Sequence, residues 1–159
     1  MTEQCSLRLA DESATLDLGA ALAHGIAPGR VLYLHGELGA GKTTLVRGLL
    51  RGLGHAGRVK SPTYTLVELY SVSSLNLYHF DFYRFKDRSE WVSSGFREYF
   101  NPDSVCVIEW PERAEGLLAP PDLELRLAFS NGERTGTLRA HSSAGRVWLA
   151  AASKHLPRG

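Results

Sequence analysis

Residues 36–43 constrain the fold of this chain more than any other segment. They read Gly-Glu-Leu-Gly-Ala-Gly-Lys-Thr and match the pattern G-x-x-x-x-G-K-[ST] at every fixed position. In such a loop the glycines permit tight turns that point successive backbone N–H groups inward, around phosphate oxygens. The loop is expected between a strand and a helix, because the helix N-terminus adds the positive end of its dipole. The motif therefore predicts a nucleotide-binding P-loop in an α/β fold.

The segments on either side of the loop have the patterns of these two elements. Residues 31–35 form a short apolar run that predicts a strand leading directly into the loop. After the loop, Leu45, Leu49 and Leu53 recur at helical spacing, and Gly54 provides a stop. The strand–loop–helix context that a P-loop requires is thus present in the sequence.

The remaining elements alternate between strands and helices. Residues 5–10 predict an edge strand, and a helix is expected from Asp11 or Ser13 through about Ile26. Further strand-like runs lie at 64–70, 75–83, 105–110, 123–129 and 134–141, with turns at 71–74 and 131–132, and a helix in two pieces spans 88–100. We expect an α/β sandwich with a mixed, partly parallel sheet flanked by helices and a β-rich end. A length of 159 residues predicts one P-loop ATPase domain over residues 1–159.

Composition narrows the classes of function. The formal net charge is +1, so the chain lacks the basic field that drives non-specific nucleic-acid binding. The first residues do not resemble a signal peptide, and no apolar run approaches the roughly 20 residues of a membrane span. Cys5 and Cys106 lie far apart without metal-ligand spacing. We expect a reduced, cytoplasmic setting.

Two acidic residues at strand ends are candidates for the rest of the site. A P-loop NTPase needs an acid on a neighbouring strand to hold the metal directly or through water. Glu109 follows four apolar residues, and Asp81 follows a similar run that contains His79. Both acids are expected to line the site, and which of them positions the attacking water stays open.

The nucleotide base is assigned by elimination. The guanine-binding pattern N-K-x-D and the L-S-G-G-Q signature of ABC-type ATPases do not occur, and the arginines are scattered rather than gathered in a nucleotide-kinase lid. ATP is therefore favoured.

Four motifs in this order carry a family resemblance. The P-loop is followed by Ser-Pro-Thr-Tyr-Thr-Leu-Val-Glu at 61–68, His-Phe-Asp-Phe-Tyr-Arg at 79–84 and Ile-Glu-Trp-Pro at 108–111. Together they resemble the bacterial TsaE family, formerly called YjeE. The likeness extends from residues 12–18 to residues 142–145, and Phe82 stands where the family often has leucine.

The resemblance implies a function. TsaE proteins are small P-loop ATPases needed to make threonylcarbamoyladenosine, the modified base beside the anticodon of tRNA. They bind the TsaB–TsaD heterodimer, in which TsaD is the transferase, and their weak ATPase activity rises in the complex. The resemblance thus implies ATP and Mg²⁺ as ligands, contact with tRNA only through the complex, no membrane, and a monomer when alone.

The resemblance also implies residue roles. Lys42, Asp81 and Glu109 would be catalytic, Thr43 and Glu109 would bind Mg²⁺, and the loop with Ser61 and Thr63 would sense the γ-phosphate. The nucleotide contacts would come from Thr15, Glu37, Leu38, Gly39, Ala40, Gly41, Lys42, Thr43, Thr44, Ser61, Thr63 and Arg134.

Several of these assignments have ordinary alternatives. Thr15 and Arg134 are equally expected as a helix cap and a surface residue, and Trp110 as a core aromatic. His79 within a strand is more typical of a hydrogen-bonded structural residue than of a catalytic base.

We also keep alternatives at the level of function. The chain would be an ATPase that drives a tRNA-modification complex, or an ATP-dependent binding module in which hydrolysis is minor. A small-molecule kinase is disfavoured because no substrate-binding lid is visible.

Overall fold

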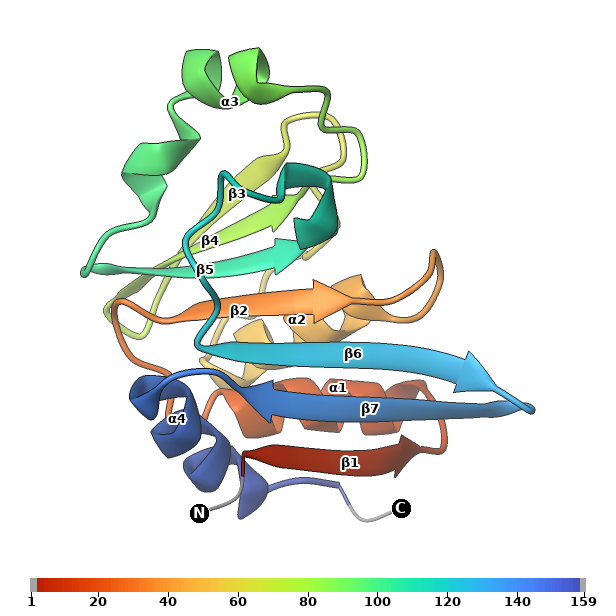
Figure 1. The fold of residues 1–159 in the computed structure, drawn as a ribbon. Coiled ribbons are helices and arrows are strands. Elements are labelled where there is room, and N and C mark those ends of the chain that lie inside the picture. The colour runs from red at the N-terminus through yellow and green to blue at the C-terminus, as the bar shows by residue number, and fades with distance from the viewer. Residues whose placement is uncertain (1–2, 158–159) are drawn as a thin grey trace.

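The computed structural model describes residues 3–157 and contains a seven-stranded sheet in the order β1-β7-β6-β2-β5-β4-β3 (Figure 1). The strands are β1 (Gln4–Leu9), β2 (Val31–His35), β3 (Val67–Val72), β4 (Leu75–Asp81), β5 (Ser104–Glu109), β6 (Leu123–Ser130) and β7 (Glu133–Ala140). The helices are α1 (Glu12–Leu22), α2 (Lys42–Gly52), α3 (Arg88–Ser94) and α4 (Ser143–Ser153), with 3₁₀ turns at Phe96–Tyr99 and Pro111–Ala114. The expected α/β architecture with a mixed sheet is confirmed.

The centre of the sheet is parallel and its margins are antiparallel. Strand β2 pairs in parallel with β5 and β6, and β5 pairs in parallel with β4. The register places Leu34 beside Glu109 and Glu109 beside Asp81, so these residues form one row across three strands. Because parallel strands end at the same edge, the loop after β2 and both acids share the carboxyl edge of the sheet.

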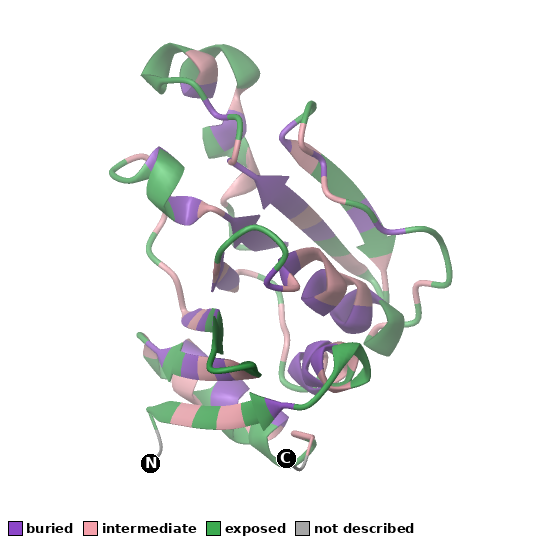
Figure 2. Ribbon diagram, turned by 90° about the vertical axis from the view of Figure 1, so that its right-hand side faces the viewer, coloured by how far each residue is buried: buried purple, intermediate pink, exposed green. Residues whose placement is uncertain are grey.

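Separate hydrophobic clusters cover the two faces. One joins the helices α1, α2 and α4 to the sheet, and the other packs aromatic residues of α3 and the first 3₁₀ turn against β4 and β5. Strand β5 is buried along its whole length, whereas exposed and partly buried residues alternate along β1. In Figure 2 the strand nearest the N-terminus is accordingly striped, and interior strands are largely purple. A fully buried β5 is what a continuously apolar parallel strand predicts.

Helices α1 and α2 approach each other through glycine. A Cβ atom on Gly19 would lie 2.2 Å from the carbonyl oxygen of Leu45, and one on Gly48 would lie 2.2 Å from that of Leu16. Only glycine permits such a close approach of two backbones. This contact holds α2, and with it the end of the glycine-rich loop, against α1.

Several expected boundaries differ from the structure. Helix α1 ends at Leu22 rather than near Ile26, because Gly25 adopts a φ of 88° that a helix does not allow. Strand β3 starts at Val67 rather than at residue 64, because the N–H of Leu66 donates to the carbonyl of Pro62 at 2.8 Å and closes a turn. Strand β4 ends at Asp81 rather than at residue 83.

The expected β-rich end is present as β6 and β7, but the helix α4 that follows them was not expected from the sequence. The side chain of Ser142 accepts a hydrogen bond from the N–H of Gly145 at 2.9 Å and caps the helix. Trp148 is fully buried, and its indole N–H donates to the carbonyl of Leu22 at 2.8 Å. The serine cap and the spacing of Trp148 and Ala152 were the available signals. Within residues 3–157 no helix has the length and apolar character needed to cross a membrane.

Trp148→Phe is expected to lower the free energy of unfolding by about 1–3 kcal/mol, because the carbonyl of Leu22 loses its donor inside the core. Urea denaturation measures this change. Val147→Ala is the matched control, since Val147 is 61% exposed on the same helix and its loss should change stability by less than about 0.5 kcal/mol. Equal effects of the two substitutions would contradict the docking of α4 through Trp148.

Candidate functional site

The glycine-rich loop connects β2 to α2 and depends on backbone angles that favour glycine. Gly39 and Gly41 have φ values of 79° and 106°, in the left-handed region. Gly41 occupies the N-cap position of α2 without a side-chain cap, so no side chain takes up the free N–H groups of the first helical turn. The loop therefore presents backbone donors at the positive end of a helix, which is a site for anions.

A pocket of about 300 Å³ opens beside this loop at the carboxyl edge of the sheet. Its walls come from the loop, from α2, from the segment before β3 and from the ends of β4 and β5. The lining residues are Leu38, Gly39, Gly41, Lys42, Thr43, Thr44, Ser61, Thr63, Asp81, Tyr83, Glu109 and Trp110. Most of the site residues expected from the sequence thus meet in one pocket.

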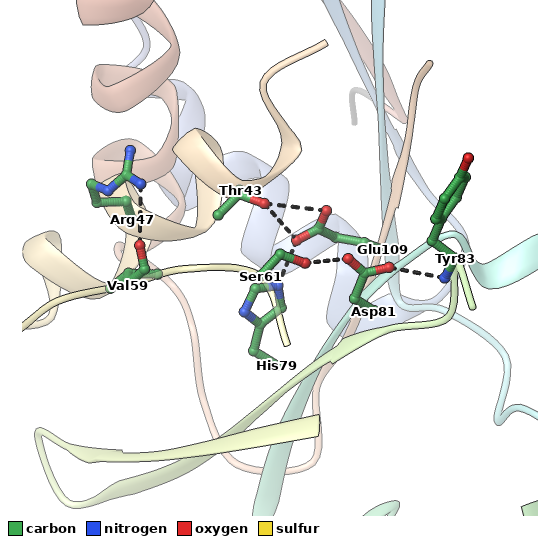
Figure 3. A network of polar contacts seen from close by, with 8 residues as sticks. All are labelled: Thr43, Arg47, Val59, Ser61, His79, Asp81, Tyr83 and Glu109. Carbon is green, nitrogen blue, oxygen red and sulfur yellow. Dashed lines mark hydrogen bonds and ion pairs between the residues drawn. The ribbon is translucent and has the colours of Figure 1, made fainter. Parts of the chain in front are cut away.

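The two acids have separate hydroxyl partners. The Thr43 hydroxyl lies 3.1 Å and 3.4 Å from the two carboxylate oxygens of Glu109 and donates to that group. The Ser61 hydroxyl donates to Oδ2 of Asp81, and the backbone N–H of Tyr83 donates to Oδ1 at 2.9 Å (Figure 3). Both carboxylates are 3% exposed. The site therefore contains two buried acids, one held to α2 and one held to the segment before β3.

Lys42 points back into its own loop. Its ammonium donates to the carbonyls of Gly36 and Glu37, the latter at 3.1 Å, and lies 4.1 Å from the centre of the Trp110 ring. Burial lowers the pKa of Lys42 below its usual value of 10.5, and nearby carboxylates, first among them Glu109, oppose this shift. An anion bound in the loop would offer the ammonium a partner of opposite charge.

The donor set is suited to Mg²⁺ that arrives with a phosphate ligand. In the part of the chain that the structure describes, no group of three or more His, Cys, Asp or Glu side chains could hold a metal by itself. Mg²⁺ usually takes one or two carboxylates and fills its remaining positions with water and substrate phosphates. Glu109 and the hydroxyl of Thr43 form such a partial set, so the residues fit this ion.

Hollows on the other side of the loop contain most of the remaining expected residues. A hollow of about 480 Å³ is lined by Glu37, Ala40 and Arg134 among others, and one of about 340 Å³ lies between Arg134 and the start of α1. Thr15 lines none of these spaces. It is fully buried behind the loop, with its methyl group 3.5 Å from where a Cβ atom of Gly41 would lie.

Tyr83 and Phe129 also help to form these walls, although neither was expected as a site residue. Tyr83 lines the pocket and follows Asp81 by two positions, so its place in the motif was the available signal. Phe129 is 68% exposed beside the loop on β6. No local pattern marks it, because β6 reaches the loop only through the order of strands in the sheet.

Comparison with known proteins assigns a family to this arrangement. The profile described as "Threonylcarbamoyl adenosine biosynthesis protein TsaE" matches residues 9–137. The chain belongs to the TsaE family. The match ends before residues 138–145, which the sequence resemblance had included.

Individual TsaE proteins align over most of their length. The tRNA threonylcarbamoyladenosine biosynthesis protein TsaE of Haemophilus influenzae is 47% identical over 123 residues, covering 77% of this chain and 78% of that protein. The protein of the same name from Bacillus subtilis is 39% identical over 123 residues, covering 77% of each chain. The crystal structure of Bacillus subtilis YdiB superposes with a TM-score of 0.77 at 32% identity and covers 98% of this chain and 97% of that one. The TsaE family is thus involved in tRNA threonylcarbamoyladenosine biosynthesis, and the expected family and fold are both confirmed.

Lys42→Met is expected to stabilise the nucleotide-free TsaE-family chain. A pKa that is lower in the folded chain means that the unfolded chain binds the proton more tightly. The free energy of unfolding therefore rises with pH between the lowered pKa and 10.5. Below the lowered pKa, Lys42 is charged in the folded chain, and burying this charge lowers the free energy of unfolding by its full amount. Methionine removes this cost, so the Tm at neutral pH should rise above that of wild type.

Differential scanning calorimetry from pH 7 to pH 10 checks this prediction. The difference in Tm between wild type and Lys42→Met should shrink as the pH rises. Lys60→Met is the control, because Lys60 is an exposed lysine outside the pocket and should show no such trend. A Lys42→Met protein less stable than wild type at every pH would contradict the prediction.

Proposed function

We propose that the chain is a weak P-loop ATPase that binds and hydrolyses Mg-ATP to drive the TsaB–TsaD transferase cycle in threonylcarbamoyladenosine modification of tRNA. It would act as a cytoplasmic, single-domain monomer that reaches tRNA only through the complex. The observation that carries the proposal is the meeting of the glycine-rich loop, Lys42 and two buried acids in one pocket.

The phosphates would bind at the loop. Free backbone N–H groups at the start of α2 would donate to phosphate oxygens, and the ammonium of Lys42 would exchange its carbonyl partners for the β- and γ-phosphates. This exchange is favourable because a phosphate relieves the cost of burying the ammonium, whereas a carbonyl relieves it only in part.

Glu109 and Asp81 would have different roles in the reaction. Thr43 and Glu109 would hold Mg²⁺, which when bound would neutralise negative charge on the phosphates. Asp81 receives two hydrogen bonds that fix its orientation and leave it beside the same pocket, so it is suited to orient the attacking water. The proposal thus favours Asp81 for the water and Glu109 for the metal.

The remainder of the nucleotide would lie beyond Gly39. This residue lines the phosphate pocket and both hollows on the other side of the loop. Arg134 and the start of α1 line one of these hollows, where they would contact a ribose or base. The absence of the N-K-x-D pattern continues to favour adenine.

Activation by a partner agrees with the charges in the pocket. Among the residues that line it, Lys42 is the only cation. Phosphoryl transfer by NTPases is faster when an additional cation stabilises the transition state, and in several classes a partner supplies it. This arrangement supports the proposal of a low intrinsic rate that would rise on binding TsaB–TsaD.

The second reading, an ATP-dependent switch, is favoured by one observation. Ser61 joins the segment before β3 to Asp81, and Leu66 at the end of that segment is buried with a φ of 69°. A non-glycine residue in the left-handed region stores strain that a change of conformation can release. In this reading nucleotide binding would rearrange residues 61–66 for docking, and hydrolysis would matter little.

Lys42→Met is expected to weaken the binding of a fluorescent, non-hydrolysable ATP analogue by about 10–100-fold, because a hydrogen bond to a charged group contributes about 1.5–3 kcal/mol. Fluorescence titration measures the affinity, and Lys60→Met should bind like wild type. Wild-type affinity in the Lys42→Met protein would refute the assignment of the loop.

Asp81→Asn is expected to reduce TsaB–TsaD-stimulated ATP hydrolysis by about 100-fold or more while ATP binding is retained, since positioned general bases contribute about 10²–10⁴-fold. Glu109→Gln should also lose hydrolysis and should require more Mg²⁺. Phosphate release and tRNA modification are measured together in the reconstituted system. If both variants bind ATP and support full modification without hydrolysis, the switch is the correct reading.

A further inference from the structure

His79 is a fully buried histidine whose role the proposed function leaves open. It lies on β4 opposite Val107 of β5, two positions before the paired residues Asp81 and Glu109. Side chains two positions apart on a strand share a face, so His79 points to the same side of the sheet as both acids. Its Nε2 atom lies 2.6 Å from Oε2 of Glu109, as the dashed line in Figure 3 marks.

The bond to Glu109 accounts for a histidine at this position. Nε2 faces a carboxylate, which only accepts hydrogen bonds, so this nitrogen carries the proton. The other ring nitrogen, Nδ1, is buried and has no hydrogen-bond partner among the described residues. Burial of an unpaired nitrogen is costly, and an apolar side chain would avoid that cost. Compared with an apolar side chain at this position, histidine therefore contributes only the hydrogen bond to Glu109.

The buried position of His79 argues against a direct catalytic role. A general base must come within hydrogen-bond reach of the proton that it removes. His79 is 0% exposed, is not part of the pocket wall, and uses Nε2 for Glu109. It can act on the reaction only through that carboxylate.

We infer that His79 is a positioning residue, which holds Oε2 of Glu109 from behind and keeps the carboxylate turned toward Thr43 and the metal. The inference rests on the proposed function. Glu109 accepts hydrogen bonds from both Thr43 and His79. If Mg²⁺ took the Thr43 hydroxyl as a ligand, His79 would be the remaining donor to Glu109. Partners behind a metal ligand typically change metal affinity or activity by about 10–100-fold.

The test compares three substitutions of one buried ring. Gln places a donor nitrogen near the position of Nε2, Asn is too short to reach Glu109, and Phe keeps the ring without a donor. Each variant is titrated with Mg²⁺ in the presence of a fluorescent, non-hydrolysable ATP analogue, and the affinity for the analogue is also measured in EDTA. Thermal unfolding of each variant records its stability.

His79→Asn and His79→Phe are expected to need about 10–100-fold more Mg²⁺ for the half-maximal signal, with the affinity in EDTA unchanged within about twofold. His79→Gln should stay within about threefold of wild type. Leu77→Val is the control for general loosening, because Leu77 is buried on the same face of β4 and pairs with Val105, four residues before Glu109. It should lower the Tm without changing the Mg²⁺ requirement.

Two outcomes would overturn the inference about His79 without affecting the proposed function. One is a wild-type Mg²⁺ requirement in His79→Asn, and the other is a folded His79→Gln protein that is as defective as His79→Phe. If wild-type protein fails to bind the ATP analogue at all, the proposed function itself fails. The wild-type titration therefore separates the two failures.

Discussion

The hydrogen bond between Thr43 and Glu109 joins the two halves of the site. Thr43 lies in the first turn of α2, and Glu109 ends the buried strand β5. The bond spans 66 residues of sequence, and it exists because β2 and β5 are parallel neighbours whose carboxyl ends coincide. The site therefore depends on two features of the fold. The sheet order brings β2 and β5 together, and the glycine contact holds α2 against α1.

The charged side chains of the site are hydrogen-bonded to neighbouring side chains and to the loop. Lys42 binds loop carbonyls and lies over Trp110, Glu109 accepts from Thr43 and His79, and Asp81 accepts from Ser61. Each bond satisfies a buried charge that would otherwise be costly. In the proposed reaction the bonds on the pocket side would be exchanged for bonds to phosphate, metal or water, whereas the bond from His79 to Glu109 would remain. The pocket-side groups would thus contact the ligands, whereas His79 would only orient Glu109.

Much of the fold was predictable because its signals are local. The hairpin turn at Asn131–Gly132, the break at Gly95 between two helical pieces, and the apolar run of β5 all have their expected places. The failures also have local causes. Gly25 ended α1 early, and the turn closed by Leu66 delayed β3. Helix α4 has local signals as well, since Ser142 caps it and three consecutive alanines favour a helix, but these signals were overlooked.

The sequence by itself determined the glycine-rich loop and its family, because the loop's conformation follows from glycine at fixed spacing and needs no distant partner. It also named both acids, since each ends an apolar run. Only the tertiary structure decided their partners: Glu109 lies against Thr43 and His79, and Asp81 lies against Ser61. The physical reason is that hydrogen bonds between strands depend on register and side-chain direction, which a linear pattern does not contain.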